Sequence, residues 1–179
     1  MSSSTQPRLT LILGGARSGK STFAEKLGRQ YPRVTYLATA QAFDDEMTER
    51  IAKHQSERPT HWNTVECPFD PASAIRAARN ETDCYLLDCI TLLVSNLLLA
   101  NESAAEETTY SAVDNLISAF RETQADLILV SNEVGLGLVP DNPLGRCYRD
   151  LLGRVNQQLA AQADTVYFLI AGLPMKVKY

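Results

Sequence analysis

Eight residues near the amino end combine glycines, a lysine and a serine in a spacing suited to binding phosphate. The segment reads GGARSGKS and comprises Gly14, Gly15, Ala16, Arg17, Ser18, Gly19, Lys20 and Ser21. It fits the pattern G-x-x-x-x-G-K-[ST]. Glycines let backbone N–H groups converge on phosphate oxygens, and a following helix points its positive end at the same oxygens. We expect Lys20 to contact the β- and γ-phosphates of a nucleoside triphosphate, and the Ser21 hydroxyl to ligate Mg²⁺.

The same pattern arises by accident in roughly one chain per hundred of this length at average residue usage. A chance match would not require a strand before the loop and a helix after it. Here the apolar run Leu9–Leu13 precedes the loop, and helix-forming residues from Lys20 to Tyr31 follow it. This context favours a functional phosphate loop.

Asp88 is a further candidate functional residue, because it ends the apolar run Cys84–Asp88. A carboxylate at the end of such a strand holds Mg²⁺ in many nucleotide-hydrolysing proteins. The alternative is that Asp88 caps the helix that begins at Ile90. Both roles are open from the sequence, and the metal role is favoured.

Continuous apolar runs separated by helical segments indicate a parallel sheet covered on both faces. The predicted strands are Leu9–Leu13, Val34–Ala38, Trp62–Glu66, Cys84–Asp88, Asp126–Ser131 and Thr165–Ile170. The predicted helices are Lys20–Tyr31, Phe43–Glu57, Pro71–Arg79, Ile90–Ala100, Tyr110–Thr123 and Leu144–Ala163. The expected fold is an α/β P-loop NTPase fold with a RecA-like, mostly parallel sheet, whose ligands gather at the carboxyl ends of the strands.

The remaining segments are expected to be irregular. We predict a flexible tail over residues 1–8 and a single nucleotide-binding domain over residues 9–179. The polar stretch Asn101–Thr109 is predicted to be a flexible loop, and Glu133–Pro143 a loop rich in glycine and proline. The residues after Ile170 are predicted to form a short tail.

Composition excludes several classes of protein. The chain has 179 residues, of which 45% are hydrophobic and 21% charged, with a formal net charge of −4. This charge offers no broad attraction to nucleic acid or anionic lipid. No apolar run reaches the ~20 residues that span a bilayer. The four cysteines lack C-x-x-C spacing, which indicates reduced thiols in a cytoplasmic protein.

Several blocks of the sequence resemble one protein family along nearly the whole chain. They are GGARSGKS, YLATAQAFDDEMTERIAKHQSERP (Tyr36–Pro59), HWNTVEC (His61–Cys67), LLDCITLLVSNLL (Leu86–Leu98), SNEVGLGLVPDNPLGRCYRDLLGRVNQQLA (Ser131–Ala160) and AGLPMKVK (Ala171–Lys178). The resemblance is to the bifunctional adenosylcobinamide kinase/adenosylcobinamide-phosphate guanylyltransferase family of cobalamin biosynthesis. It implies phosphorylation of adenosylcobinamide with ATP or GTP, followed by transfer of GMP from GTP to the new phosphate.

The resemblance also implies a histidine–GMP intermediate, and its R-I-x-x-H-x-x-x-R-P block places that histidine at His54. With an ordinary pKa near 6.5, about three quarters of such imidazoles are neutral at pH 7 and keep a lone pair for attack. Glu46 and Arg50 lie at four-residue spacing before His54 and would share a helix face with it. From the residues alone, a solvated helix histidine is the favoured interpretation. The rival nucleophile is His61.

The family's other nucleotide contacts carry over by position. They fall on Ala38, Thr39, Ala40, Gln55, Ser56, Glu57, Arg58, Glu66 and Asp88. Asn132 and Glu133 remain open between a contact to cobinamide or Mg²⁺ and simple turn formation. The resemblance further implies a homotrimer. Triphosphate chemistry implies Mg²⁺ as the cofactor, because the ion neutralises developing charge.

Two rival functions remain open at this stage. One is a monofunctional P-loop kinase of a small molecule, which forms no covalent intermediate. The other is a nucleotide-gated switch, which would bind a triphosphate without group transfer. No partner-binding arm or Ras-type N-K-x-D guanine motif supports the switch.

Overall fold

The structure is a computed structural model that describes residues 6–42, 48–49, 52, 55–56 and 58–179. The strands of this part form one sheet in the order β3-β2-β4-β5-β1-β6-β7. They are β1 (Leu9–Gly14), β2 (Val34–Ala38), β3 (Asn63–Glu66), β4 (Cys84–Asp88), β5 (Asp126–Val130), β6 (Thr165–Ile170) and β7 (Leu173–Lys178). All neighbouring strands pair in parallel except β6 and β7, which are antiparallel. The α/β fold with a mostly parallel sheet is therefore confirmed.

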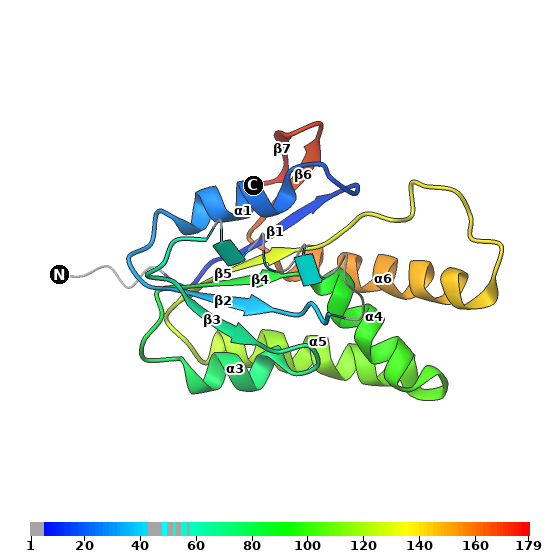
Figure 1. The fold of residues 1–179 in the computed structure, drawn as a ribbon, viewed down its shortest axis with the longest axis horizontal. Helices are drawn as coiled ribbons and strands as arrows, with labels where there is room; N and C mark the ends of the chain where they lie inside the picture. The colour runs from blue at the N-terminus through cyan, green and yellow to red at the C-terminus, as the bar shows by residue number, and fades with distance from the viewer. Residues whose placement is uncertain (1–5, 43–47, 50–51, 53–54, 57) are drawn as a thin grey trace.

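Helices cover both faces of this sheet (Figure 1). They are α1 (Lys20–Gly28), α3 (Pro71–Ala77), α4 (Ile90–Ala100), α5 (Ala105–Arg121) and α6 (Pro143–Gln162). Successive side chains of the central strands enter opposite cores: Leu11 packs with α3 to α6, whereas Ile12 packs on the α1 side. Burial on both faces explains why these strands are continuous apolar runs rather than alternating ones.

Two sequence-based predictions about irregular segments are wrong. Asn101–Thr109 is not a flexible loop, because Glu102–Ala104 forms a 3₁₀ turn and α5 starts at Ala105. Ala105 and Thr109 are buried while Glu106 and Glu107 face solvent, so the polar residues mark the outer face of a helix. The predicted tail after Ile170 is also wrong, since it forms β7 on the edge of the sheet.

The apolar residues that recur at three-and-four spacing along α6 are largely buried. Leu151, Leu152, Val155 and Leu159 are buried, and Tyr148 packs partly against the same core. Leu144 is the exception, because it lies in the first turn of the helix and is exposed. Asn142 caps this helix by accepting a hydrogen bond from the Gly145 N–H at 2.7 Å.

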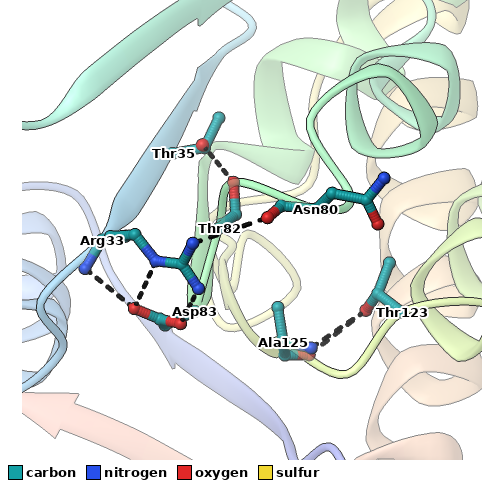
Figure 2. A network of polar contacts seen from close by, with 7 residues as sticks. All are labelled: Arg33, Thr35, Asn80, Thr82, Asp83, Thr123 and Ala125. Atoms are coloured by element: carbon teal, nitrogen blue, oxygen red, sulfur yellow. Dashed lines mark hydrogen bonds and ion pairs between the residues drawn. The ribbon is translucent and has the colours of Figure 1, made fainter.

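A polar network fixes the amino end of β2 against β4 (Figure 2). The Arg33 guanidinium donates to both carboxylate oxygens of Asp83, at 3.0 and 2.6 Å. The buried hydroxyls of Thr35 and Thr82 lie 2.6 Å apart. These contacts set the register that aligns Ala38 with Asp88 at the other end of the strands.

Candidate nucleotide-binding site

The glycine-rich segment Gly14–Ser21 forms a compact turn between β1 and α1. Arg17 and Gly19 adopt left-handed backbone angles, with φ of 56° and 92°. The Ser18 N–H donates to the Gly15 carbonyl at 3.3 Å, and α1 begins at Lys20. Such a turn followed by a helix amino end presents several N–H groups to one point, as an anion site requires.

Lys20 lies against this turn. Its side chain is buried, and Nζ donates a hydrogen bond to the Gly15 carbonyl oxygen at 2.6 Å. A buried ammonium is stable only when it is paired. The Lys20 ammonium is thus held against the loop, where it could contact a bound phosphate.

The loop is braced by the last two strands of the sheet. A Cβ at Gly14 would lie 2.7 Å from the Leu169 carbonyl oxygen and 2.7 Å from Ser18 Oγ, so only glycine fits there. The Gly172 N–H, in the turn between β6 and β7, donates to the Ser18 carbonyl at 3.0 Å. The phosphate loop therefore has backbone support from the carboxyl-terminal hairpin.

Three of the predicted nucleotide contacts lie in one row at the carboxyl edge of the sheet. Ala38 pairs in register with Glu66 of β3 on one side and with Asp88 of β4 on the other. The β5 strand separates β4 from β1, so one strand intervenes between Asp88 and the phosphate loop. This order places the acidic residue beside the triphosphate site rather than within the loop.

Asp88 is not the cap of α4. The N-cap residue is Cys89, and no side chain caps the helix. Instead, Asp88 Oδ2 accepts a hydrogen bond from the Tyr36 hydroxyl at 3.0 Å. The capping alternative is wrong, and Asp88 lies at the carboxyl end of β4, on the edge where such sheets bind ligands.

Tyr36 also supports Arg58. The Arg58 guanidinium carbon lies 3.5 Å from the centre of the Tyr36 ring, a cation–π arrangement. Burial, and then the negative charge of Asp88, raise the pKa of the Tyr36 phenol, so it remains a hydrogen-bond donor at neutral pH. No sequence signal marked Tyr36, because its role depends on which strands are neighbours.

Arg58 has two side-chain hydrogen-bond donors without acceptors in the described part of the chain. Its Nε and Nη1 atoms are buried and have no hydrogen-bond partner within the described part of the chain. Buried donors of this kind are rare in proteins, and each calls for an explanation. An anionic ligand would supply the missing acceptors.

Thr39 has a structural role in this structure. Its hydroxyl donates to the Cys89 carbonyl at 2.8 Å and accepts from the Cys89 N–H at 2.8 Å. The buried Asn96 amide donates to the Thr39 carbonyl at 2.9 Å. A nucleotide contact from Thr39 or from its neighbours Ala38 and Ala40 stays a prediction.

The remaining predicted site residues fall within residues 46–61, and the structure describes only some of them. Gln55 and Ser56 are helical and exposed, and His61 is exposed before β3. His54 and Glu57, together with Glu46 and Arg50, lie outside the described residues.

Turn formation, one of the two alternatives left open for Glu133, is observed, because its Oε1 accepts a hydrogen bond from the Gly135 N–H at 2.9 Å. The backbone N–H of Asn132 donates to Thr91 Oγ1 at 2.7 Å. A contact of either residue to cobinamide or Mg²⁺ stays a prediction.

A parallel sheet with a glycine-rich strand–loop–helix turn and an acidic strand end defines the class of P-loop nucleotide-binding proteins. Within that class, residues 10–177 match the family described as cobinamide kinase / cobinamide phosphate guanyltransferase. The chain belongs to this family.

Curated relatives cover almost the full chain. It is 45% identical over 180 residues to the bifunctional adenosylcobalamin biosynthesis protein CobU of Salmonella typhimurium, spanning 95% of this chain and 99% of the relative. It is 42% identical over 180 residues to the protein of the same name from Escherichia coli, with the same shares covered. The bifunctional adenosylcobalamin biosynthesis protein CobP of Pseudomonas aeruginosa is 45% identical over 169 residues, which cover 94% of this chain and 96% of that protein.

Proposed function

We propose that this chain carries out two successive group transfers on one corrinoid. In the first, the aminopropanol hydroxyl of adenosylcobinamide attacks the γ-phosphate of ATP or GTP and a nucleoside diphosphate leaves. In the second, GMP passes from GTP to the new phosphate, giving adenosylcobinamide-GDP and pyrophosphate. The observation that carries the proposal is the intact phosphate loop in a chain 45% identical to a relative named as bifunctional.

The nucleotide phosphates would lie in the Gly14–Ser21 turn. Its backbone N–H groups and the amino end of α1 would surround the phosphate oxygens, and Lys20 Nζ would exchange the Gly15 carbonyl for an oxygen of the β- or γ-phosphate. Because this exchange replaces a neutral acceptor with a charged one, the bond becomes stronger.

We infer that Mg²⁺ accompanies the triphosphate. The Ser21 hydroxyl and the Asp88 carboxylate are oxygen donors of the kind that Mg²⁺ prefers. The part of the chain that the structure describes has no group of three or more histidine, cysteine or acidic side chains that could hold a metal. Phosphate oxygens and water would therefore complete the coordination, as is usual for nucleotide-bound Mg²⁺. The ion would neutralise charge that develops on the phosphates.

Arg58 supports the placement of an anion between β2 and the phosphate loop. Its two buried nitrogens without acceptors would donate to a phosphate or to a base carbonyl. Glu66, Gln55 and Ser56 are accessible on the same edge of the sheet or next to Arg58 in sequence, which suits contacts to the ribose or base.

For the second step we infer a covalent intermediate on His54. A ring nitrogen would attack the α-phosphorus of GTP, so that an N–P bond forms as the bond to pyrophosphate breaks. The corrinoid phosphate then attacks the same phosphorus and releases the imidazole. The support is the position of His54 in the R-I-x-x-H-x-x-x-R-P block that the chain shares with its family.

We also propose an oligomeric state, a cellular location and a domain organisation for this chain. The family resemblance supports a homotrimer. The cysteine spacing supports a cytoplasmic enzyme, and the chain length supports one domain over residues 9–179. No helix in the described ranges is long and apolar enough to cross a membrane.

Radiolabelled GTP tests both steps. Wild type, His54→Ala and His61→Ala are incubated with Mg²⁺ and α-³²P-GTP, denatured, and treated with acid or hydroxylamine. We expect acid-labile label on wild type and His61→Ala and none on His54→Ala. In parallel, γ-³²P-GTP should label adenosylcobinamide with all three proteins, because His54 takes no part in the first step.

Other outcomes of the labelling experiments would indicate one of the two rival functions. Phosphorylation of the corrinoid with no protein label on wild type indicates a monofunctional kinase. Nucleotide binding with neither transfer indicates a switch.

A further inference from the structure

An open cavity of about 490 Å³, lined by both polar and apolar groups, lies between α6 and the carboxyl ends of β1 and β5. Its walls include Leu13 at the end of β1, Glu133 after β5, and Arg149, Gly153 and Gln157 from α6. The volume falls in the range of small-molecule sites, about 300–1,000 Å³. None of the nucleotide contacts assigned above lines it.

The cavity adjoins the phosphate loop. Leu13 immediately precedes Gly14, and the Glu133 N–H donates to the Gly14 carbonyl at 3.0 Å. A molecule in the cavity would therefore lie against the first residue of the loop. A phosphoryl acceptor likewise has to bind close to the phosphate loop.

The wall of the cavity is held rigidly. Buried Asn156 accepts a hydrogen bond from Ser131 Oγ at 2.7 Å and donates one to the Asn132 carbonyl at 2.9 Å. These two bonds fix α6 against the end of β5. A pre-formed wall lowers the ordering cost of binding a ligand.

Gly153 lines the cavity without a side chain. A Cβ added there would meet no atom within 4 Å, so packing in the protein does not require a glycine. Glycine inside a helix costs about 1 kcal/mol relative to alanine. The missing side chain leaves space at the wall, as expected where a ligand approaches the helix backbone closely.

The charges of the cavity indicate the class of ligand. Arg149 pairs with Asp150 at 2.9 Å, and Arg154 pairs with Glu106 at 2.7 Å. With its cations paired, the cavity is a poor site for a second polyphosphate. The Gln157 amide, which has no protein partner among the described residues, suits hydrogen bonding to uncharged amide groups of a ligand.

We propose that this cavity is the acceptor subsite and binds the amide-bearing rim of the corrinoid. The inference rests on the proposed function and adds the place where the second substrate docks. A corrinoid carries acetamide and propionamide arms around a ring wider than the cavity, so one edge of the molecule enters. The aminopropanol arm then extends past Glu133 toward the phosphate loop.

Equilibrium dialysis against adenosylcobinamide, followed by the corrinoid's visible absorbance, tests this subsite. The variants are Gly153→Leu and Gln157→Leu, with Gly153→Ala as a smaller change should the leucine variant fold poorly. Ala161→Leu is the matched control, because Ala161 is exposed on the same helix and does not line the cavity. Affinity for GTP and the size of the protein in solution are measured in parallel.

We expect Gly153→Leu and Gln157→Leu to weaken corrinoid binding at least tenfold, Gly153→Ala to weaken it less, and Ala161→Leu to leave it unchanged. GTP affinity and size should stay at wild-type values. Wild-type corrinoid affinity in both leucine variants would overturn the subsite and leave the proposed function standing. A change in protein size without a change in corrinoid affinity would assign the cavity to a second copy of the chain. A wild type that binds no corrinoid would overturn both proposals.

Discussion

The Tyr36 hydroxyl of β2 donates a hydrogen bond to the Asp88 carboxylate of the neighbouring strand β4, at 3.0 Å. The ring of the same tyrosine lies under the Arg58 guanidinium. One buried side chain thus holds both a proposed metal ligand and a proposed phosphate contact. Its hydroxyl and its ring serve different neighbours, so their effects are separable by substitution.

Replacing Tyr36 tests this division. Tyr36→Phe removes the bond to Asp88 but keeps the ring under Arg58. We expect it to raise the Mg²⁺ concentration needed for half-maximal activity several-fold with little change in GTP affinity, and to destabilise the fold by about 1–3 kcal/mol. Tyr36→Leu should weaken GTP binding as well. The measurements are Mg²⁺ titrations of activity and GTP binding for both variants. The same behaviour of Tyr36→Phe and Tyr36→Leu would contradict this assignment.

Lys20 should contribute to nucleotide binding far more than to stability. A hydrogen bond to a charged partner is worth up to about 3 kcal/mol, so Lys20→Ala should weaken GTP binding about a hundredfold. Its thermal unfolding should stay close to that of wild type. Lys26→Ala is the control, because Lys26 is exposed on the same helix. Equal losses in the two variants would show that helix charge, rather than the loop contact, sets affinity.

Two glycines at helix positions should respond in opposite directions to alanine. A Cβ at Gly28 would lie 2.9 Å from the Trp62 ring, whereas one at Gly153 meets nothing within 4 Å. Gly28→Ala should destabilise by about 1–3 kcal/mol through overpacking. Gly153→Ala should stabilise by up to about 1 kcal/mol through helix propensity. Urea unfolding measures both, and shifts of the same sign would show that local packing is not the cause.

The cap of α3 should make stability depend on acidic pH. Asp70 accepts hydrogen bonds from the Ser73 N–H at 3.1 Å and the Ser73 hydroxyl at 2.6 Å. The hydroxyl bond is the largest cause of the lowered pKa of Asp70. With the folded pKa below the unfolded value, the stabilisation is complete above about pH 4 and is lost as pH falls through the folded pKa.

Substitutions of Asp70 separate the contribution of the capping hydrogen bonds to stability from the contribution of the negative charge. Asp70→Ala should cost about 1 kcal/mol at pH 7, and Asp70→Asn less, because asparagine remains a good cap. The difference between wild type and Asp70→Asn in urea unfolding should shrink from pH 7 to pH 3. A difference that stays constant over this range would show that the carboxylate charge does not contribute.

Sequence alone predicted the buried strands and the phosphate loop because each is a local pattern. Runs such as Cys84–Asp88 are apolar on both faces, and the Gly14–Ser21 spacing follows from phosphate chemistry. The start of α5 was missed because Glu106 and Glu107 made a helix face look like a polar loop. The β7 strand was missed because Pro174 and exposed apolar residues do not mark an edge strand.

Other features of the site depend on non-local geometry. The contact between Tyr36 and Asp88 requires that β2 and β4 be neighbours in the observed register, which no local pattern encodes. The cavity beside α6 likewise brings together Gly153 and Leu13 at the end of β1, although these residues are far apart in sequence. The role of His54 rests on resemblance alone, since a single histidine carries no local signature of its chemistry.

The bracing of the phosphate loop by the β6–β7 hairpin has a consequence for the order of assembly. Residues 14–21 leave the ribosome early, but both strands that flank β1 are made much later, as residues 126–130 and 165–170. Until Leu169 and Gly172 have emerged, the loop lacks its backbone supports. At about 5–20 residues per second, the nascent chain spends many seconds with this motif present but unfinished. The first motif to be translated therefore gains its backbone supports only when the final hairpin closes.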